Sequence, residues 1–247
     1  MFMTTRGLVL REVRYKEADR ILTILTEDEG KISARARGAL RSKSKVAAAT
    51  QLLTFSELTM FGNKGKWSIN EASPVEQFLG LRGDIERLAL GSYFAEVLEA
   101  VSDEDCPNPE VLRLGLNSLY ALSGGLCPME QVKAVFELRL MCLSGYEPDL
   151  SQCHGCGATE PESAFLWPES GELYCESCAR PGMLPVGGAA LRAMRHIIGV
   201  EPKRIFSFTL SEEGLGELVR VCECYALYQL DRPFAGLDYY KKLRKFT

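Results

Sequence analysis

The run GLVLREVRYKEADRILTILTEDEGKISARAR, residues 7–37, decides the fold of the first part of the chain. It contains three short segments rich in Val, Ile, Leu, Thr and Tyr, at residues 7–15, 20–26 and 31–37. Turn-forming residues separate them at 16–19 and 27–30, as between neighbouring strands. Two more segments of this kind follow at 52–62 and 66–73. Five short strands in about 80 residues favour a small β-barrel or sandwich.

Beyond residue 84 the apolar residues repeat with the period of a helix. Leu90, Phe94, Val97 and Val101 share one stripe, which predicts an amphipathic helix. Further helices are expected at 111–122, from Pro128 to Gly145, and at 187–199, 211–231 and 236–244. Residues 146–186 have no helical period and are rich in Pro, Gly and Cys.

Four cysteines form two knuckles, Cys153-His-Gly-Cys156 and Cys175-Glu-Ser-Cys178, with 18 residues between them. This spacing is typical of tetrahedral zinc. Two disulfides or a redox pair are the alternatives, and His154 could replace one cysteine as ligand. Four thiolates leave no open position, so we expect one structural Zn²⁺. Gly155 and Gly157 would relieve crowding in the first knuckle, and Phe165 and Trp167 are expected to pack over the site.

These patterns predict an α+β protein, with a small N-terminal β-barrel or sandwich, the OB-fold among the candidates, then helices and an inserted four-cysteine zinc module. The expected parts are the β-domain at 1–80, the first part of a helical body at 81–145, the zinc module at 146–186 and the C-terminal part of the helical body at 187–247.

Charge is distributed unevenly along the chain, whose net charge is −4. Residues 1–80 contain 13 Lys and Arg against 9 Asp and Glu, whereas residues 81–247 contain 16 against 24. The stretch 147–179, around the zinc knuckles, has seven acidic residues and no Lys or Arg. A polyanion is therefore expected to bind the N-terminal part and not the zinc module.

A basic row is the candidate surface for single-stranded nucleic acid. Cations and apolar residues alternate from residue 31 to 37, which on a strand places the cations on one face. Phosphate neutralisation with base stacking on Trp67, Phe61 or Tyr15 is the chemistry expected of such a surface. A merely solvated face is the alternative. The candidate DNA-binding residues are Lys31, Arg35, Arg37, Arg41, Lys43, Lys45, Lys64, Lys66 and Trp67.

Catalytic patterns are missing from the sequence. It has only two histidines, His154 and His196, and it has neither a Gly-rich phosphate loop nor a nucleophile elbow. An enzyme is not expected. No apolar run approaches the roughly 20 residues of a membrane helix, and the N-terminus does not resemble a signal peptide, so a cytoplasmic protein is expected.

Several stretches resemble the family of the bacterial recombination mediator RecO. They are residues 7–39, then FELRLMCLSGYEPDLSQCHGCG at 136–157, FLWPESGELYCESC at 165–178 and DRPFAGLDYYKKL at 231–243. The loop RGALRSKSK at 37–45 departs from the family, where more arginines would follow the glycine directly. This departure leaves the individual DNA contacts open.

The resemblance implies a fold, functions and partners. The fold is α+β, with an N-terminal OB-fold β-barrel at residues 1–80, which would bind DNA, followed by an all-α helical domain with an inserted four-cysteine zinc module. The resemblance also implies binding of single- and double-stranded DNA, annealing of complementary strands, and help with RecR in loading RecA onto strands coated by single-strand-binding protein (SSB). A protein of this kind is expected at the nucleoid. The acidic C-terminal tail of SSB would need an apolar pocket rimmed by cations, for which the candidates are Arg192, Arg195, Lys203 and Arg204. A scaffold that joins partner proteins without binding DNA is the alternative function.

Overall fold

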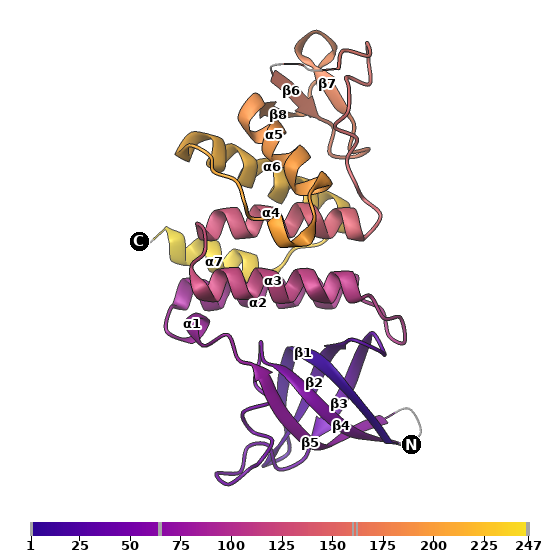
Figure 1. Cartoon of the computed structure of the whole chain (residues 1–247), viewed down its shortest axis with the longest axis vertical. Coiled ribbons are helices and arrows are strands. Elements are labelled where there is room, and N and C mark those ends of the chain that lie inside the picture. Colours follow the sequence, from indigo (N-terminus) through magenta and orange to yellow (C-terminus); the bar gives the residue numbers. More distant parts are fainter. Residues whose placement is uncertain (1, 64–65, 160, 162, 246–247) are drawn as a thin grey trace. The chain divides into compact units, whose positions relative to one another are not determined.

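The protein is described by a computed structural model over residues 2–63, 66–159, 161 and 163–245. The chain packs as two compact units (Figure 1). The first unit combines Met1–Gly124 with Phe234–Thr247, and the second is Gly125–Pro233. The first therefore joins two stretches that are far apart in sequence.

The first unit begins with a closed five-stranded barrel. Its strands are β1 (Phe2–Tyr15), β2 (Asp19–Thr26), β3 (Lys31–Ala36), β4 (Phe55–Asn63) and β5 (Lys66–Glu76). They are ordered β1-β2-β3-β5-β4, and β1 pairs with β4 to close the barrel. Only the β3–β5 pairing is parallel. This closed five-stranded arrangement confirms the predicted OB-fold.

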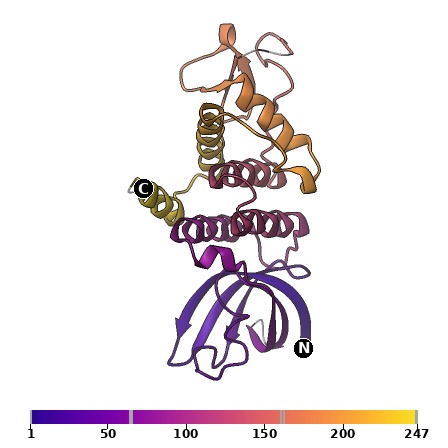
Figure 2. The same cartoon turned by 60° about the vertical axis from the view of Figure 1, so that its left-hand side comes forward.

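Side chains on β3 alternate between the two faces of the barrel wall, as the sequence predicted. Ile32, Ala34 and Ala36 are buried inside, whereas Ser33 and Arg37 are exposed. The inward residues belong to a core cluster completed by Val9, Leu22, Ile24, Ala39, Val46, Leu58, Met60 and Ile69. Figure 2 shows the strands curving around the interior of the barrel. Because a slip of one residue would exchange the two faces, burial of the core fixes which cations face outward.

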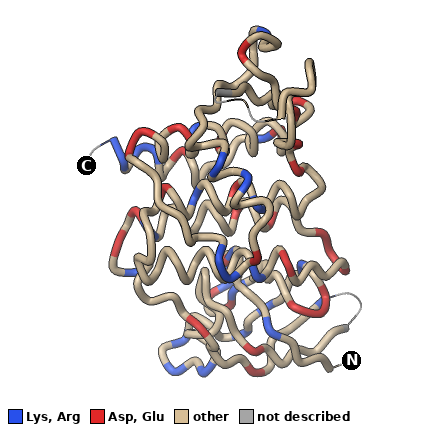
Figure 3. The backbone as a smooth tube through the Cα atoms, turned by 45° about the horizontal axis from the view of Figure 1, so that its top comes forward, with Lys and Arg blue, Asp and Glu red and all other residues tan. Residues whose placement is uncertain are grey.

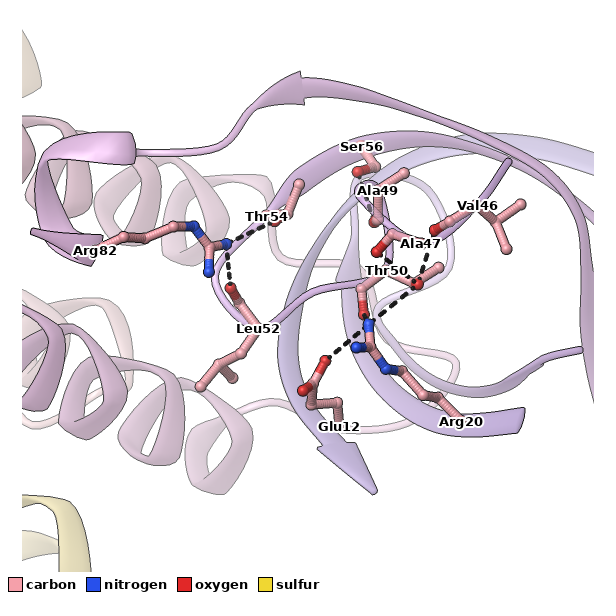
Figure 4. A network of polar contacts seen from close by, with 10 residues as sticks. All are labelled: Glu12, Arg20, Val46, Ala47, Ala49, Thr50, Leu52, Thr54, Ser56 and Arg82. Carbon is pink, nitrogen blue, oxygen red and sulfur yellow. Dashed lines mark hydrogen bonds and ion pairs between the residues drawn. The ribbon is translucent and has the colours of Figure 1, made fainter. Parts of the chain in front are cut away.

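The connection between β3 and β4, residues 37–54, is a series of turns tied to the barrel (Figure 4). Arg20 on β2 donates a hydrogen bond to the Thr50 carbonyl at 3.2 Å and forms an ion pair with Glu12 at 3.2 Å. Thr50 in turn donates from its hydroxyl to the Val46 carbonyl at 2.8 Å. This network holds the second half of the connection. The first half carries the exposed cations Arg41, Lys43 and Lys45.

Helices α1 (Leu79–Arg82), α2 (Ile85–Val101), α3 (Pro109–Gly124) and α7 (Ala235–Arg244) complete the first unit. Asp84 caps α2, because its side chain accepts hydrogen bonds from the backbone N–H groups of Glu86 and Arg87. A Cβ added at Gly91 would lie 3.0 Å from Leu53, in the connection before β4, and 3.4 Å from Leu119 of α3. The glycine thus lets both leucines reach α2.

The C-terminal helix α7 packs closely on α2. The Glu96 carboxylate of α2 accepts hydrogen bonds from the backbone N–H groups of Ala235 at 3.1 Å and Gly236 at 2.8 Å. An added Cβ at Gly236 would lie 2.9 Å from the Cα of Tyr93. Glu96 therefore supplies the acceptors that the first turn of α7 lacks within the helix.

The second unit contains α4 (Met129–Leu143), α5 (Gly188–Gly199), α6 (Glu212–Leu230) and a three-stranded sheet ordered β7-β6-β8. The strands are β6 (Ser163–Leu166), β7 (Leu173–Cys175) and β8 (Leu184–Gly187), with short 3₁₀ turns η1 (Glu176–Cys178) and η2 (Pro202–Arg204). Between α4 and α6, the buried Lys133 Nζ lies 2.8 Å from Glu137 and 2.9 Å from Glu223. The two carboxylates compensate its charge, as burial of an ammonium group requires.

The two units divide the helical region differently from the predicted parts. The predicted boundaries place α4 in the first part of one helical body, residues 81–145, and α7 in its C-terminal part, residues 187–247. In the structure α4 packs on α5 and α6, whereas α7 packs on α2. Helices pair through matching apolar faces, and these need not be neighbours along the chain. In the described part of the chain, no helix is both long and apolar enough to cross a membrane.

The contact between α7 and α2 leads to a test of stability. Gly236→Ala should lower the free energy of unfolding of the first unit by about 1–3 kcal/mol, because its Cβ would press on the backbone of Tyr93. Gly83→Ala is the matched control, since a Cβ there meets nothing within 4 Å. Urea unfolding of the two variants measures the difference. Equal midpoints would contradict the tight packing of α7.

Candidate metal centre and nucleic-acid groove

The structure brings the four knuckle cysteines together. Cys153 lies in a loop, Cys175 ends β7, and Cys178 ends η1. The Sγ atoms of these three and of Cys156 all lie within 4.8 Å of one another, and those of Cys156 and Cys175 are 3.6 Å apart. A metal bound tetrahedrally at about 2.3 Å from each thiolate would separate the sulfurs by roughly 3.8 Å. The set therefore fits a metal ion.

Glycines allow the first knuckle its tight turn. A Cβ at Gly155 would lie 2.9 Å from the Cβ of Cys178, so a side chain there would push the second knuckle away. Gly157 has a φ of +77°, in the left-handed region that favours glycine, and its N–H donates to the Cys153 carbonyl at 2.8 Å. The backbone N–H of Cys175 also donates to the Cys153 sulfur at 3.2 Å.

The protonation of the four thiols also favours a cation. A hydrogen bond with the Ser177 hydroxyl, at 3.1 Å, lowers the pKa of the Cys175 thiol to about 6. Sharing a hydrogen bond with the sulfur of Cys175 raises the pKa of the Cys178 thiol to about 12. Four thiols this close do not all ionise at neutral pH by themselves. A bound divalent cation would stabilise all four thiolates.

His154 does not join the cysteine cluster. Its Nε2 lies 3.1 Å from a carboxylate oxygen of Glu172, its side chain is 57% exposed, and its ring lies 6.0 Å from that of Tyr174. The alternative in which His154 replaces a cysteine therefore loses support.

The two cysteine knuckles adjoin a sheet that, within its described residues, is buried on one face only. Ala164, Leu166, Leu173 and Val186 are buried. The expected covering residues Phe165 and Trp167 are instead half-buried, and Trp167 packs at 6.3 Å against the ring of Tyr174. Residues of α6 hold the module: Glu217 accepts from the Gly187 N–H at 2.8 Å, and Arg220 donates to the Pro185 carbonyl at 2.9 Å.

A second candidate site is a groove of about 570 Å³ on the barrel, where β3 and β5 meet. The two strands pair Arg35 with Ser68, and β4 pairs Phe61 with the same Ser68. Arg35 and Ser68, 33 positions apart in the sequence, thus lie side by side. The lining residues are Tyr15, Ile21, Ser33, Ala34, Arg35, Arg37, Phe61, Lys66, Trp67 and Ser68.

Arg35 is held by neighbours in the groove. Its Nε donates to the Asp19 carboxylate at 2.8 Å, its Nη2 donates to the same oxygen, and its guanidinium carbon lies 5.2 Å from the centre of the Tyr15 ring. Asp19 also accepts from the Gly38 N–H at 2.7 Å. This backbone hydrogen bond, followed by that of Arg35, lowers the pKa of the Asp19 carboxyl. Asp19 therefore stays ionised at neutral pH.

Other predicted DNA-binding residues have diverse environments. Arg37 and Lys66 line the groove, are exposed, and form no ion pair within the described ranges. Trp67 lies on Gly62, where an added Cβ would be 2.6 Å from the indole. Arg41, Lys43 and Lys45 are exposed on the adjoining loop but do not line the groove.

Lys31 does not line the groove and forms a structural contact instead. Its Nζ donates to the Glu99 carbonyl of α2 at 2.8 Å, so it ties the barrel to a helix. Lys64 lies outside the described residues. The basic row of the sequence is therefore split among the groove, the adjoining loop and a structural contact. Figure 3 likewise shows acidic and basic positions interspersed over the backbone.

Sequence reasoning missed Asp19 as the ion-pair partner of the groove residue Arg35. Only cations and aromatic residues were considered as DNA-binding candidates, and Asp19 was assigned to the turn at residues 16–19. The available signal was the hairpin of β2 and β3, which places an acid at the start of one strand near Arg35 at the end of the other. Such a pair on neighbouring strands favours an ion pair.

The four cations proposed for the SSB tail differ in their surroundings. Arg195 donates twice to the Leu150 carbonyl, at 2.9 and 2.7 Å, while the other three are exposed: Arg192, Lys203 and Arg204. A cavity of about 420 Å³ beside Arg195 is lined also by Glu147 and Asp149. Its acidic lining differs from the cationic rim that the sequence analysis expected.

Comparisons with known proteins agree across both units. Residues 1–78 match the family model described as Recombination protein O N terminal, and residues 82–238 match Recombination protein O C terminal. The chain is 36% identical to "DNA repair protein RecO" of Acetivibrio thermocellus, over 98% of this chain and 97% of that protein. It is 30% identical to the protein of the same name from Alkaliphilus metalliredigens, over 98% and 100%.

The metal centre gives a second test. Cys153→Ser should lower the metal content from about one ion per chain and lower the melting temperature, because metal binding and folding are linked. Cys106→Ser is the control, since this exposed cysteine lies outside the cluster. Metal analysis and thermal unfolding measure both effects. Full metal content and an unchanged melting temperature in Cys153→Ser would show that the cluster is not a metal site.

Proposed function

Because the chain belongs to the recombination protein O family of DNA repair proteins, we propose that it acts as a recombination mediator. In this role it binds single- and double-stranded DNA, anneals complementary strands and, with RecR, helps to load RecA onto SSB-coated single strands. It works at the nucleoid in the cytoplasm and is not an enzyme.

The observation that carries the proposal is the groove where β3 and β5 meet. Arg37 and Lys66 offer it two exposed cations, and Tyr15, Phe61 and Trp67 offer it three aromatic rings. Cations that follow a backbone and rings on which bases stack are the two components of a single-strand binding surface. Arg41, Lys43 and Lys45 extend the positive charge along the adjoining loop, where a longer strand or a duplex backbone would pass.

In the proposed function, the metal centre has a structural role. Four cysteine thiolates match the ligands of structural zinc, and such a set leaves no coordination position for a substrate. We assign one Zn²⁺ to Cys153, Cys156, Cys175 and Cys178. The ion would hold together a loop-rich module whose sheet has only one buried face. The acidic residues around it would disfavour DNA contact there.

The proposal also includes binding of partner proteins by the C-terminal helical region. RecR and the acidic tail of SSB are the expected partners. Arg192, Lys203 and Arg204 are exposed and could receive carboxylates of that tail, whereas Arg195 is already engaged with Leu150. Surface plasmon resonance with the tail peptide, on variants that replace these three residues, tests their role.

DNA binding itself is tested by a single substitution. Arg37→Ala should weaken binding to an oligothymidylate and reduce the slope of log K against log salt by up to about one unit, because one phosphate contact is lost. Arg113→Ala is the control, since Arg113 is an exposed cation on α3, outside the groove. Fluorescence anisotropy over a series of salt concentrations measures both quantities.

Two results would count against this proposal. Equal effects of Arg37→Ala and Arg113→Ala would remove the groove from it. If the unaltered protein does not bind the oligonucleotide even at low salt, the scaffold function would be favoured.

A further inference from the structure

The three basic residues that line the groove do not have the same surroundings. Arg37 and Lys66 are exposed and, within the described ranges, have no acidic partner. Arg35 has its charge compensated by Asp19, whose side chain is only 13% exposed. A phosphate would therefore find two free cations and one that is already paired.

The geometry of Arg35 also limits what it can bind. A guanidinium group grips a phosphate best with two parallel N–H groups along one edge. In Arg35 the edge formed by Nε and Nη2 is occupied by the Asp19 carboxylate. What remains is the end formed by Nη1 and Nη2 together with the planar face, and the planar face is the part of a guanidinium that stacks on rings. Arg35 lines the groove with a side chain that is 32% exposed.

Asp19 itself is fixed in place. It accepts a hydrogen bond from the backbone N–H of Gly38, two residues after β3, and it lies opposite Tyr15 in the pairing of β1 with β2. The Tyr15 ring lies 5.2 Å from the guanidinium carbon of Arg35. Asp19, Arg35 and Tyr15 thus form a preorganised cluster at one side of the groove. Preorganisation lowers the entropic cost of binding.

We infer that Arg35, positioned by Asp19 beside Tyr15, stacks on an unpaired base and gives the groove its preference for single strands. Arg37 and Lys66 contact phosphates, which single strands and duplexes share. Bases in a duplex already stack on their neighbours, whereas bases of a single strand are free to stack on protein side chains. The inference rests on the proposed function, because it requires that the groove binds DNA.

Asp19→Asn tests whether the groove binds DNA by attracting phosphates alone or also by stacking of Arg35 on a base. The two models predict opposite changes in affinity for a single strand. This substitution removes a negative charge, so a groove that works only by attracting phosphates should bind DNA more tightly. If Asp19 positions Arg35 for stacking, the variant should bind a single-stranded oligothymidylate about tenfold more weakly than its control, as expected for the loss of one stacked base. The control is Glu17→Gln, which removes the same charge from the same turn at an exposed residue with no ion pair in the described structure.

Arg35→Lys provides a second variant, which keeps the charge and loses the planar group. It should lower affinity for the single strand about tenfold, leave the salt slope unchanged, and have little effect on duplex binding. An oligonucleotide with the same phosphates but abasic sites separates the contacts further. The unaltered protein and Arg35→Lys should bind it equally, because no base remains to stack.

The outcomes separate the inference from the proposed function. Tighter single-strand binding by Asp19→Asn than by Glu17→Gln, or normal binding by Arg35→Lys, overturns the stacking role while DNA binding by the groove stands. Absence of binding by the unaltered protein overturns both. Circular dichroism of each variant verifies that the barrel has folded, and Arg35→Lys still decides the matter if Asp19→Asn does not fold.

Discussion

The parallel pairing of β3 with β5 is the contact on which the barrel and its groove depend. It joins only three residue pairs, Ala34 with Trp67, Arg35 with Ser68 and Ala36 with Ile69. These few pairs turn an open antiparallel sheet into a closed barrel, so within its described residues the barrel has no unpaired edge strand. The same pairs bring the cations of β3 beside the aromatic residue and cation at the start of β5. The residue pairs that close the barrel therefore also form the groove.

The structure uses positive charge in more than one way. Lys31 stabilises the attachment of the barrel to α2, and Arg35 is neutralised by Asp19. Arg37 and Lys66 are left to attract a polyanion. A count of Lys and Arg along the chain overstates the field that DNA would meet. Affinity for a polyanion should follow the unpaired cations, and base preference should follow the paired one.

The sequence predicted the five barrel strands and the longer helices, because each follows from a local pattern. It did not predict β6, β7 and β8, which are only three or four residues long. Period-two alternation on residues 31–37, helical stripes after residue 84 and the paired knuckles are all visible in short windows. Other features depend on residues distant in the sequence. Lys31 meets a carbonyl 68 residues away, and Glu96 meets the N-terminus of α7 about 140 residues away. In the metal module, short strands between turns hid which side chains face inward, so Leu166 and Leu173 are buried where Phe165 and Trp167 were expected.

The position of α7 has a consequence for how the chain folds as it is made. Residues 125–233 form their own unit between the two stretches that make up the first. On the ribosome, the barrel and α2 emerge early, but the helix that covers Tyr93 and receives the caps of Glu96 emerges after the whole second unit. Until then, apolar surface on α2 is exposed to water and to other chains. A stalled or prematurely terminated polypeptide would thus be prone to aggregation through its N-terminal part, which is synthesised first. Chaperone binding during synthesis would be expected at α2.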